Sequence, residues 1–199
     1  MRRLAFYRSL WTLLGAAVLL CGLWQTAAGL RDRAALAAAG ELSGLDAAAA
    51  PQHGFVRGTV ELLLSAAGRG AGAGRLWPLA GTDALTGETA YIVPCGTGYA
   101  VLSVPAVRTA AFAADGTGAL LTPQRILARV RRGGGTDLFD GETLRAALGA
   151  EKTLAPLRLV LTTEQTVRAE LPRGLWVAAA GLLVLETQRV KGEKHERNL

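Results

Sequence analysis

The sequence predicts a small α+β domain, rich in strands and with two or three short helices, flanked by two transmembrane helices. Three observations support this fold class. An uncharged stretch of 21 residues lies near the N-terminus at Leu10–Leu30, and a shorter apolar segment lies near the C-terminus at Gly174–Leu185. Between them, segments of alternating polarity, typical of strands, are mixed with segments that carry helix caps. A chain of 199 residues has room for one such domain.

The first apolar stretch, residues 10–30, is predicted to cross a membrane as an uncleaved signal anchor. As a helix it reaches about 31 Å, close to the hydrocarbon thickness of roughly 30 Å. Three arginines precede it within residues 1–9, which assigns this end to the cytoplasm by the positive-inside rule. Two alternatives stay open: a cleaved signal peptide with an exit at Thr26–Ala28, and a lipoprotein signal at Cys21.

The second predicted span covers residues 172–190, and its apolar segment is shorter than that of the first span. Pro172 suits the first turn of a helix, where its missing N–H costs nothing. The charged residues Arg173, Glu186 and Arg189 fall in the end turns, where long side chains reach the interface. The alternative is an amphipathic or core-packed C-terminal helix. With two spans, the tail 191–199 is cytoplasmic and the central domain is extracytoplasmic.

Small residues recur four positions apart in both predicted spans. The pairs are Gly22 with Thr26 in the first span and Gly174 with Ala178 in the second. Such pairs let helix backbones approach closely, so the two spans are expected to pack against each other.

The region between the spans divides into a linker, residues 31–53, and a domain, residues 54–171. The linker is rich in Ala, the best helix former, and is expected to continue the first helix as far as Gly40. Pro51 and His53 mark the break into the domain.

Three patterns in the domain predict strands. Phe55–Ser65 alternates apolar and polar residues, with Gly58 indicating a bulge or a close backbone approach. Thr89–Val93 and Tyr99–Val104 are separated by a Gly-containing connection and predict a hairpin. Leu157–Thr163 predicts a last strand before the second span.

Two cap patterns predict short helices. The first helix begins at Thr122-Pro123, carries an apolar stripe and ends at Gly133. The second helix is capped by Asp140, has Glu142 in its first turn, and ends at Gly149.

The first of these predicted helices carries a candidate anion or partner patch. Arg125, Arg129 and Arg132 fall at i, i+4 and i+7 on one helix face, with Arg131 beside them. Such a patch suits lipid headgroups, an acidic partner or a cell-envelope polymer. The alternative is a solvated face whose charges favour the helix dipole.

Cys95, in the Gly-rich hairpin connection, is a candidate reactive thiol. A nucleophilic thiol needs a base or a depressed pKa, and His53 is the one histidine of the predicted domain. An intermolecular disulfide or a buried structural role are the alternatives. Because Cys21 lies in the predicted span, no internal disulfide is expected.

No pattern in the sequence indicates a catalytic, cofactor or metal site. Asp137, Asp140 and Glu142 lie close together but lack the spacing of a calcium loop, and helix capping explains two of them. The Gly-rich stretch Ala66–Gly74 lacks the Lys-Ser/Thr pair of a phosphate loop. We therefore expect that the protein has no enzymatic activity and binds no metal and no cofactor. An envelope enzyme using His53, Cys95 and Asp137 is the alternative.

Gly58-Thr59-Val60 and Tyr91-Ile92-Val93-Pro94 give the chain a resemblance to a loose group of uncharacterised bacterial two-span membrane proteins. The resemblance implies an N-terminal span, a strand-rich extracytoplasmic domain of unknown function and a C-terminal span. It implies no catalytic residues.

The net charge of +6 is read as a topology signal rather than as a sign of nucleic-acid binding. Residues 1–9 contribute +3, and residues 31–173, with 15 basic and 13 acidic residues, contribute +2. The expected function is that of a membrane-anchored protein whose outer domain binds a partner or serves as a scaffold in an envelope complex. Expected partners are the bilayer and a protein partner or a second copy. A sensor that recognises an anionic ligand through the arginine-rich helix is the alternative.

Overall fold

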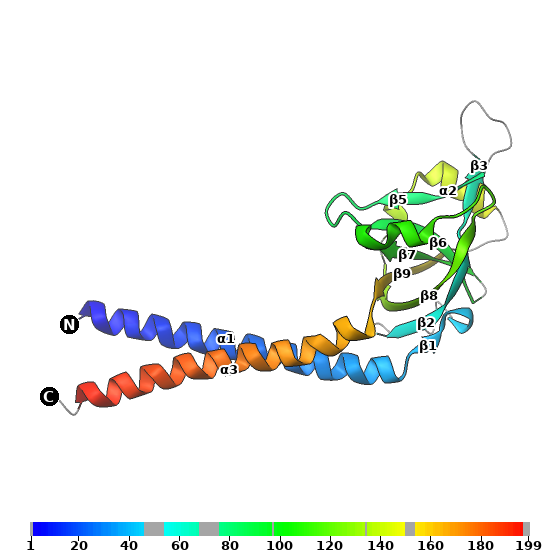
Figure 1. The fold of residues 1–199 in the computed structure, drawn as a ribbon. Helices are drawn as coiled ribbons and strands as arrows, with labels where there is room; N and C mark the ends of the chain where they lie inside the picture. The colour runs from blue at the N-terminus through cyan, green and yellow to red at the C-terminus, as the bar shows by residue number, and fades with distance from the viewer. Residues whose placement is uncertain are drawn as a thin grey trace. The chain divides into compact units, whose positions relative to one another are not determined.

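The computed structural model describes residues 2–45, 54–67, 76–96, 98–133, 135–149 and 154–196. The chain divides into two compact units (Figure 1). One consists of Met1–Ala34 and Glu164–Leu199, and the other is the domain Ala35–Thr163. Each unit is described by itself.

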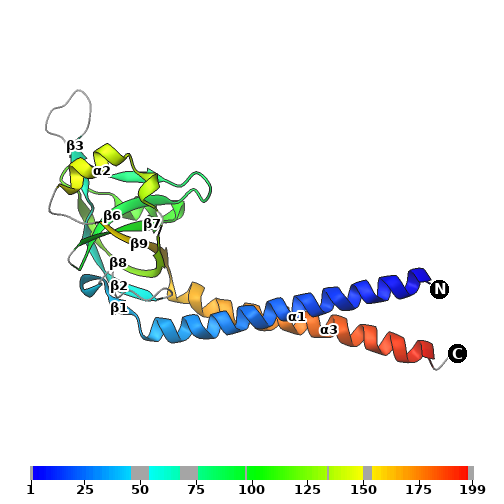
Figure 2. The same ribbon diagram turned by 180° about the vertical axis from the view of Figure 1, so that it is seen from behind.

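The first unit is a pair of long helices, α1 (Arg2–Ala37) and α3 (Glu164–Glu196). They lie side by side and antiparallel, with the start of α1 and the end of α3 together (Figures 1 and 2). α1 ends close to the predicted Gly40. The expectation that Pro172 opens the second helix is wrong, because α3 begins at Glu164 and Pro172 lies inside it.

Four glycines, Gly22, Gly29, Gly174 and Gly181, let the two helix backbones approach closely. A Cβ atom added to Gly22 would lie 2.6 Å from the Ala178 Cα, and one on Gly174 would lie 2.6 Å from the Thr26 backbone nitrogen. Real Cβ atoms essentially never approach other atoms within 3.0 Å. The predicted close packing of these two pairs of small residues is therefore confirmed.

The register of the helix pair is constant along its length. Gly15 faces Leu185, Gly22 faces Ala178 and Gly29 faces Leu171, so seven residues forward on α1 correspond to seven residues back on α3. The same register sets Trp24 of α1 level with Trp176 of α3. Both indole side chains are exposed, at 77% and 76%.

α1 has the length and composition of a membrane span, over Ser9–Ala37, and among the described helices it is the one that does. Only 17% of its apolar window is buried, whereas the core helix of a soluble protein would be mostly buried. Many of its large apolar side chains are exposed, among them Trp11, Leu13, Leu20 and Trp24. Part of the predicted membrane architecture, one N-terminal apolar helix able to span, is thus present.

The domain is built on a seven-stranded mixed sheet with strand order β1-β2-β8-β9-β7-β6-β5. β1 pairs with β2, and β7 with β9, in parallel, while the other neighbours are antiparallel. The strands are β1 (Gly40–Glu41), β2 (Phe55–Leu62), β5 (Ala80–Thr82), β6 (Thr89–Cys95), β7 (Gly98–Val104), β8 (Ala119–Arg132) and β9 (Leu154–Thr162). A separate two-stranded sheet joins β3 (Ser65–Ala67) and β4 (Leu76–Pro78).

The sheet curls, and its inner face encloses the main core. Just beyond β2, the Leu64 N–H donates to the Ile92 carbonyl of β6 at 2.8 Å, although three strands (β8, β9 and β7) lie between β2 and β6 within the sheet. Two 3₁₀ helices, η1 (Leu42–Gly44) and η2 (Ala106–Phe112), contribute Leu42 and Phe112 to this core. The predicted close approach at Gly58 is confirmed, since a Cβ there would lie 2.5 Å from the Leu42 Cβ.

A second core lies on the outer face of β6 and β7. The 3₁₀ helix η3 (Thr136–Leu138) and helix α2 (Gly141–Leu148) cover it, and Ile92 and Val101 of the sheet pack there with Leu144 of α2. The cap predicted for this helix is confirmed, because the Asp140 carboxylate accepts the Thr143 N–H at 3.0 Å. The predicted hairpin is also present as β6 and β7.

The helix predicted from Thr122 to Gly133 is wrong, because this segment forms β8. Ile126, Ala128 and Val130 alternate into the main core and satisfy a period of two. Hydrogen bonding to β2 on one side and β9 on the other outweighs the high helix propensity of Ala, Arg and Leu. Pro123, which suggested a helix start, lies where the β2–β8 register shifts, a position where a strand tolerates proline.

Candidate functional site: the arginine face of the sheet

The outer face of β2 and β8 carries four arginines, which we call the arginine face: Arg57, Arg125, Arg129 and Arg131. On β8 the even-numbered residues from Ile126 to Val130 point into the core, so the odd-numbered arginines point outward. On β2 the core takes Val56 and Val60, which turns Arg57 to the same outer side.

Strand pairing brings the arginines of the two strands together. Thr59 is paired with Arg125, Arg57 with Leu127, and Phe55 with Arg129. Arg57 is therefore the diagonal neighbour of both Arg125 and Arg129, at about 7–8 Å between backbone positions. Three of the four side chains are exposed and Arg129 is half-buried.

Arg129 is held against an aromatic ring. Its guanidinium carbon lies 5.3 Å from the centroid of the Phe55 ring, directly across the strand pair. Phe55 is only 3% exposed. A cation above an aromatic face is stabilised by about 0.5–2 kcal/mol, depending on its exposure to solvent. This contact fixes one arginine of the face in place.

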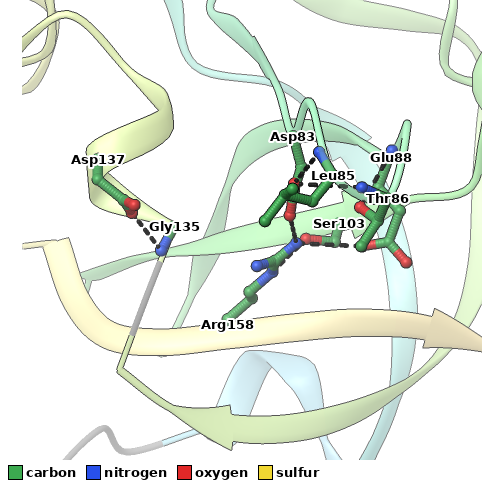
Figure 3. A network of polar contacts seen from close by, with 8 residues as sticks. All are labelled: Asp83, Leu85, Thr86, Glu88, Ser103, Gly135, Asp137 and Arg158. Atoms are coloured by element: carbon green, nitrogen blue, oxygen red, sulfur yellow. Dashed lines mark hydrogen bonds and ion pairs between the residues drawn. The ribbon is translucent and has the colours of Figure 1, made fainter.

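Strand β9, the neighbour of β8, carries a fifth arginine, Arg158, which forms ion pairs with two carboxylates. Its terminal nitrogen donates to Asp83 and to Glu88, each at 3.1 Å, and its Nε donates to the buried Ser103 hydroxyl at 2.7 Å (Figure 3). Asp83 and Glu88 bracket the turn between β5 and β6, so Arg158 ties this turn to the middle of the sheet.

This network keeps Asp83 ionised. The Arg158 guanidinium, followed by the Leu85 backbone N–H, lowers the pKa of the Asp83 carboxyl below its ordinary value of 3.8. The Asp83 and Arg158 side chains are 15% and 20% exposed, so their ion pair is partly screened by water. The network is best understood as a structural clamp on the turn.

The ion pairs of Arg158 also explain why Arg131 and Arg158 can lie directly opposite each other in the sheet. Arg131 is paired directly with Arg158 across β8 and β9, and like charges in that position destabilise a sheet. Because Asp83 and Glu88 offset the charge of Arg158, Arg131 sits beside a net negative cluster. The acidic residues nearest the arginine face along its own strands are Glu41, in register with Arg57, and Glu61 of β2.

The predicted patch residues are only partly brought together. Arg125, Arg129 and Arg131 share one face, through strand alternation rather than the helical spacing used to select them. Arg132 is paired with the core residue Leu157 and lies on the opposite side of β8. Arg57 was missed, although the alternation of Phe55–Ser65 already assigned it to the polar side of a strand.

The other candidate residues do not form a site. Cys95 is 4% exposed and belongs to the main core, and burial raises the pKa of its thiol, which disfavours the reactive thiolate. Asp137 is an exposed residue of η3 that accepts the Gly135 N–H at 2.9 Å. His53 lies outside the described residues. Within the described ranges, no three metal-ligating side chains cluster.

No family model, curated protein or solved structure matches this chain. The resemblance to two-span bacterial membrane proteins therefore stays a prediction, and the function is argued from the residues of this chain.

Proposed function

We propose that this chain is a two-span membrane protein whose extracytoplasmic domain acts as a binding or scaffold module. In this proposal α1 and α3 both cross the bilayer, with residues 1–9 and 191–199 in the cytoplasm. The domain acts by binding a protein partner or a second copy of itself, in an envelope complex, and not by catalysis.

The observation that carries the proposal is the register of the helix pair. The uncharged segment of α3, Gly174–Leu185, runs alongside residues 15–26 of α1, which is the middle of the apolar stretch of α1. A helix in backbone contact with a membrane span over this length shares its depth in the bilayer. The centres of the two apolar segments thus coincide within a residue or so.

Tryptophans and charges at the ends of the pair support the same topology. Trp24 and Trp176 lie level with each other and are exposed, as expected of rings at one membrane interface. At the other end Arg189 is level with Trp11, where a long side chain reaches the interface and avoids the insertion penalty. The basic start of α1 lies beside the end of α3, which supports the proposal that both termini face the same compartment.

The arginine face and the absence of a predicted catalytic pattern favour a binding role for the domain. A sheet face that presents several guanidinium groups suits carboxylates and phosphates, because each group offers planar, paired donors. The alternative function, a sensor or regulator that recognises an anionic ligand, uses the same arginines.

The topology is tested by a reporter fused after Leu199 and by thiol labelling of the domain in intact cells. Cys95 is too buried to serve as the probe, so Leu85, which is 97% exposed, is replaced by cysteine in a Cys21→Ser/Cys95→Ser background. We expect the reporter to be active only in its cytoplasmic form and the Leu85→Cys thiol to react with an impermeant maleimide. An extracytoplasmic reporter signal would refute the second span.

A further inference from the structure

We propose that α3 contains a hinge at Pro172 and that Arg33 of α1 holds this hinge closed by replacing the hydrogen-bond donor that proline lacks. All the contacts behind this proposal lie within the helix pair, so they do not depend on how the domain is placed. Such a hinge goes beyond the proposed function, because it gives the pair a moving part in addition to an anchoring role.

Pro172 removes one backbone hydrogen bond from α3, which otherwise runs from Glu164 to Glu196. In a regular α-helix the N–H of residue 172 would donate to the carbonyl of residue 168. Proline has no N–H and its ring crowds that same carbonyl, so the Arg168 oxygen loses its regular helical donor. Helices bend most readily at such positions.

Arg33 supplies a donor to this carbonyl from the neighbouring helix. Its terminal guanidinium nitrogen, Nη2, lies 2.9 Å from the Arg168 carbonyl oxygen, a typical N–H···O distance. We call this hydrogen bond the Arg33 latch. The guanidinium of Arg168 itself pairs with Glu164 at 3.2 Å, so Arg33 binds the backbone of this residue and not its side chain. Neighbouring helices are one of the ways in which membrane proteins satisfy carbonyls freed by proline.

The latch lies just beyond the glycine contacts of the helix pair. Gly29 meets the backbone of Leu171, and the other glycine contacts continue from there toward the end of α3. On the other side of this level neither helix has a glycine, because residues 30–37 of α1 and 164–170 of α3 contain none. Arg33 lies one turn beyond Gly29 on α1 and reaches across to α3. The latch thus holds α3 to α1 where the close backbone contacts have ended.

The hinge lies between the domain and the apolar part of α3. β9 of the domain precedes α3 with only Thr163 between them, and the uncharged segment of α3 begins at Gly174. With the latch closed, the turns before Pro172 stay on α1. With the latch open, these turns bend at Pro172 while the glycine contacts keep the rest of the pair together. The latch therefore controls whether a movement of the domain bends α3 or is passed on to the whole pair.

The strength of the latch suits a contact that opens and closes. The hydrogen bond is exposed to solvent, so water competes for both of its partners. Its contribution is that of an ordinary protein hydrogen bond, and its loss should make opening on the order of fivefold more frequent.

The test compares amide hydrogen exchange of the full chain in detergent micelles for wild type, Arg33→Met, Pro172→Ala and the double variant. Amide exchange reports how often a hydrogen-bonded segment opens. Methionine keeps the unbranched stem of Arg33 without a donor, and alanine restores the N–H at position 172. We expect Arg33→Met to speed exchange at residues 168–171 on the order of fivefold and to leave residues 178–185 unchanged.

The double variant distinguishes the latch from simple packing. Once alanine supplies a helical N–H to the Arg168 carbonyl, the donor from Arg33 is no longer needed. We therefore expect Arg33→Met to change exchange by less than about twofold in the Pro172→Ala background. The matched control is Arg168→Met, which removes one charge near the latch and leaves the carbonyl in place. It breaks only an exposed ion pair with Glu164, so a change of about twofold or less is expected.

Unchanged exchange at residues 168–171 in Arg33→Met would overturn the proposal. Equal acceleration in the two backgrounds would also overturn it, because Arg33 would then act without regard to the carbonyl that Pro172 frees. Acceleration that extends equally through residues 178–185, or into β8 and β9 of the domain, would show a general loosening and no hinge. None of these outcomes depends on whether α3 crosses the bilayer, which the reporter fused after Leu199 measures separately.

Discussion

Replacing Gly22 by alanine is expected to weaken the α1–α3 pair, whereas the same change at Gly15 is expected to leave the pair intact or strengthen it. The two glycines lie seven residues apart on the same helix and face the same partner. They differ in what a new methyl group would meet. At Gly22 it meets the backbone of Val177 and Ala178, and at Gly15 it meets the side-chain ends of Val184 and Leu185.

The magnitude follows from these contacts. At Gly22 the new Cβ would lie 2.6 Å from the Ala178 Cα, so the helices must separate locally by about 1 Å, and such overpacking costs about 1–3 kcal/mol. At Gly15 the nearest atoms, at 3.0–3.2 Å, are ends of flexible side chains that can rotate away. Alanine gains about 1 kcal/mol of helix propensity at both sites. The difference between the two variants therefore isolates the packing cost, about 1–3 kcal/mol.

The assay follows the separation of the helices directly. Pyrene is attached to the exposed Cys21 and to Val177→Cys, two positions on the same side of the helix pair next to the Gly22–Ala178 contact, in a Cys95→Ala background. Excimer emission is then recorded as the detergent mixture is titrated with dodecyl sulfate. We expect Gly22→Ala to lower the transition midpoint relative to Gly15→Ala. Gly22→Leu is expected to abolish the excimer before denaturant is added.

Equal midpoints for the Gly15 and Gly22 variants would refute the reasoning, since the packing term is the only difference between them. Ala17→Leu, on the exposed side of α1, serves as the control for added bulk and is expected to leave the excimer unchanged.

Three further predictions concern the domain. Leu102→Ala, at a fully buried position of the main core, is expected to cost about 2–5 kcal/mol in chemical unfolding; a loss below about 1 kcal/mol would contradict the assigned core. Arg158→Gln should lower the melting temperature at neutral pH. The Asp83 pKa is depressed in the folded state, so the ionised carboxylate stabilises the fold above pH 3.8, and this stabilisation is lost as the pH falls through the folded-state pKa. The difference in melting temperature between Arg158→Gln and wild type should therefore shrink in acid. An undiminished difference there would contradict the clamp. The Cys95 thiol should react with iodoacetamide slowly in the native protein and rapidly in urea, and equal rates would contradict its burial.

Local signals in the sequence predicted local structure well. The Asp140 cap, the hairpin of β6 and β7, and the close approach at Gly58 each depend on a few adjacent residues. β1 and β5, with two and three residues, are too short to carry a period and were not foreseen. Their pairing depends on the neighbouring strands rather than on their own residues.

β8 was misassigned because its sequence fits two periods. Ile126 and Val130 lie four residues apart, as on a helix face, and Ile126, Ala128 and Val130 also alternate as in a strand. Helix propensity favours a helix over these residues, but the hydrogen-bond ladders with β2 and β9 stabilise the strand. Three of the four predicted patch residues remained together because Arg125, Arg129 and Arg131 are all odd-numbered. Arg132 is even-numbered and therefore lies on the opposite side of β8.

The partners of Arg158 show a different limit of sequence reasoning. The alternation of Leu157, Leu159 and Leu161 turns Arg158 away from the core, but nothing local indicates Asp83 and Glu88, which lie 75 and 70 residues away in the chain. Only the parallel pairing of β7 with β9, after the β5–β6 turn has been placed, brings these charges together.

For the proposed second span, the packing of α3 against α1 is a further argument beside the composition of α3 itself. Taken alone, α3 is less apolar than α1, and its end turns carry charges. Its backbone at Gly174, Ala178 and Gly181 is nevertheless covered by α1, and its exposed residues between the end charges are apolar. Lipid would therefore meet only the outer side of α3, while α1 supplies the other side through close contacts that need small residues. The heptad spacing of Gly15, Gly22 and Gly29, matched by Gly174 and Gly181, keeps these contacts in phase along both helices. If α3 crosses the membrane as proposed, it would insert as half of a pair, and separating the pair at Gly22 should destabilise α3 more than any single change on its outer side.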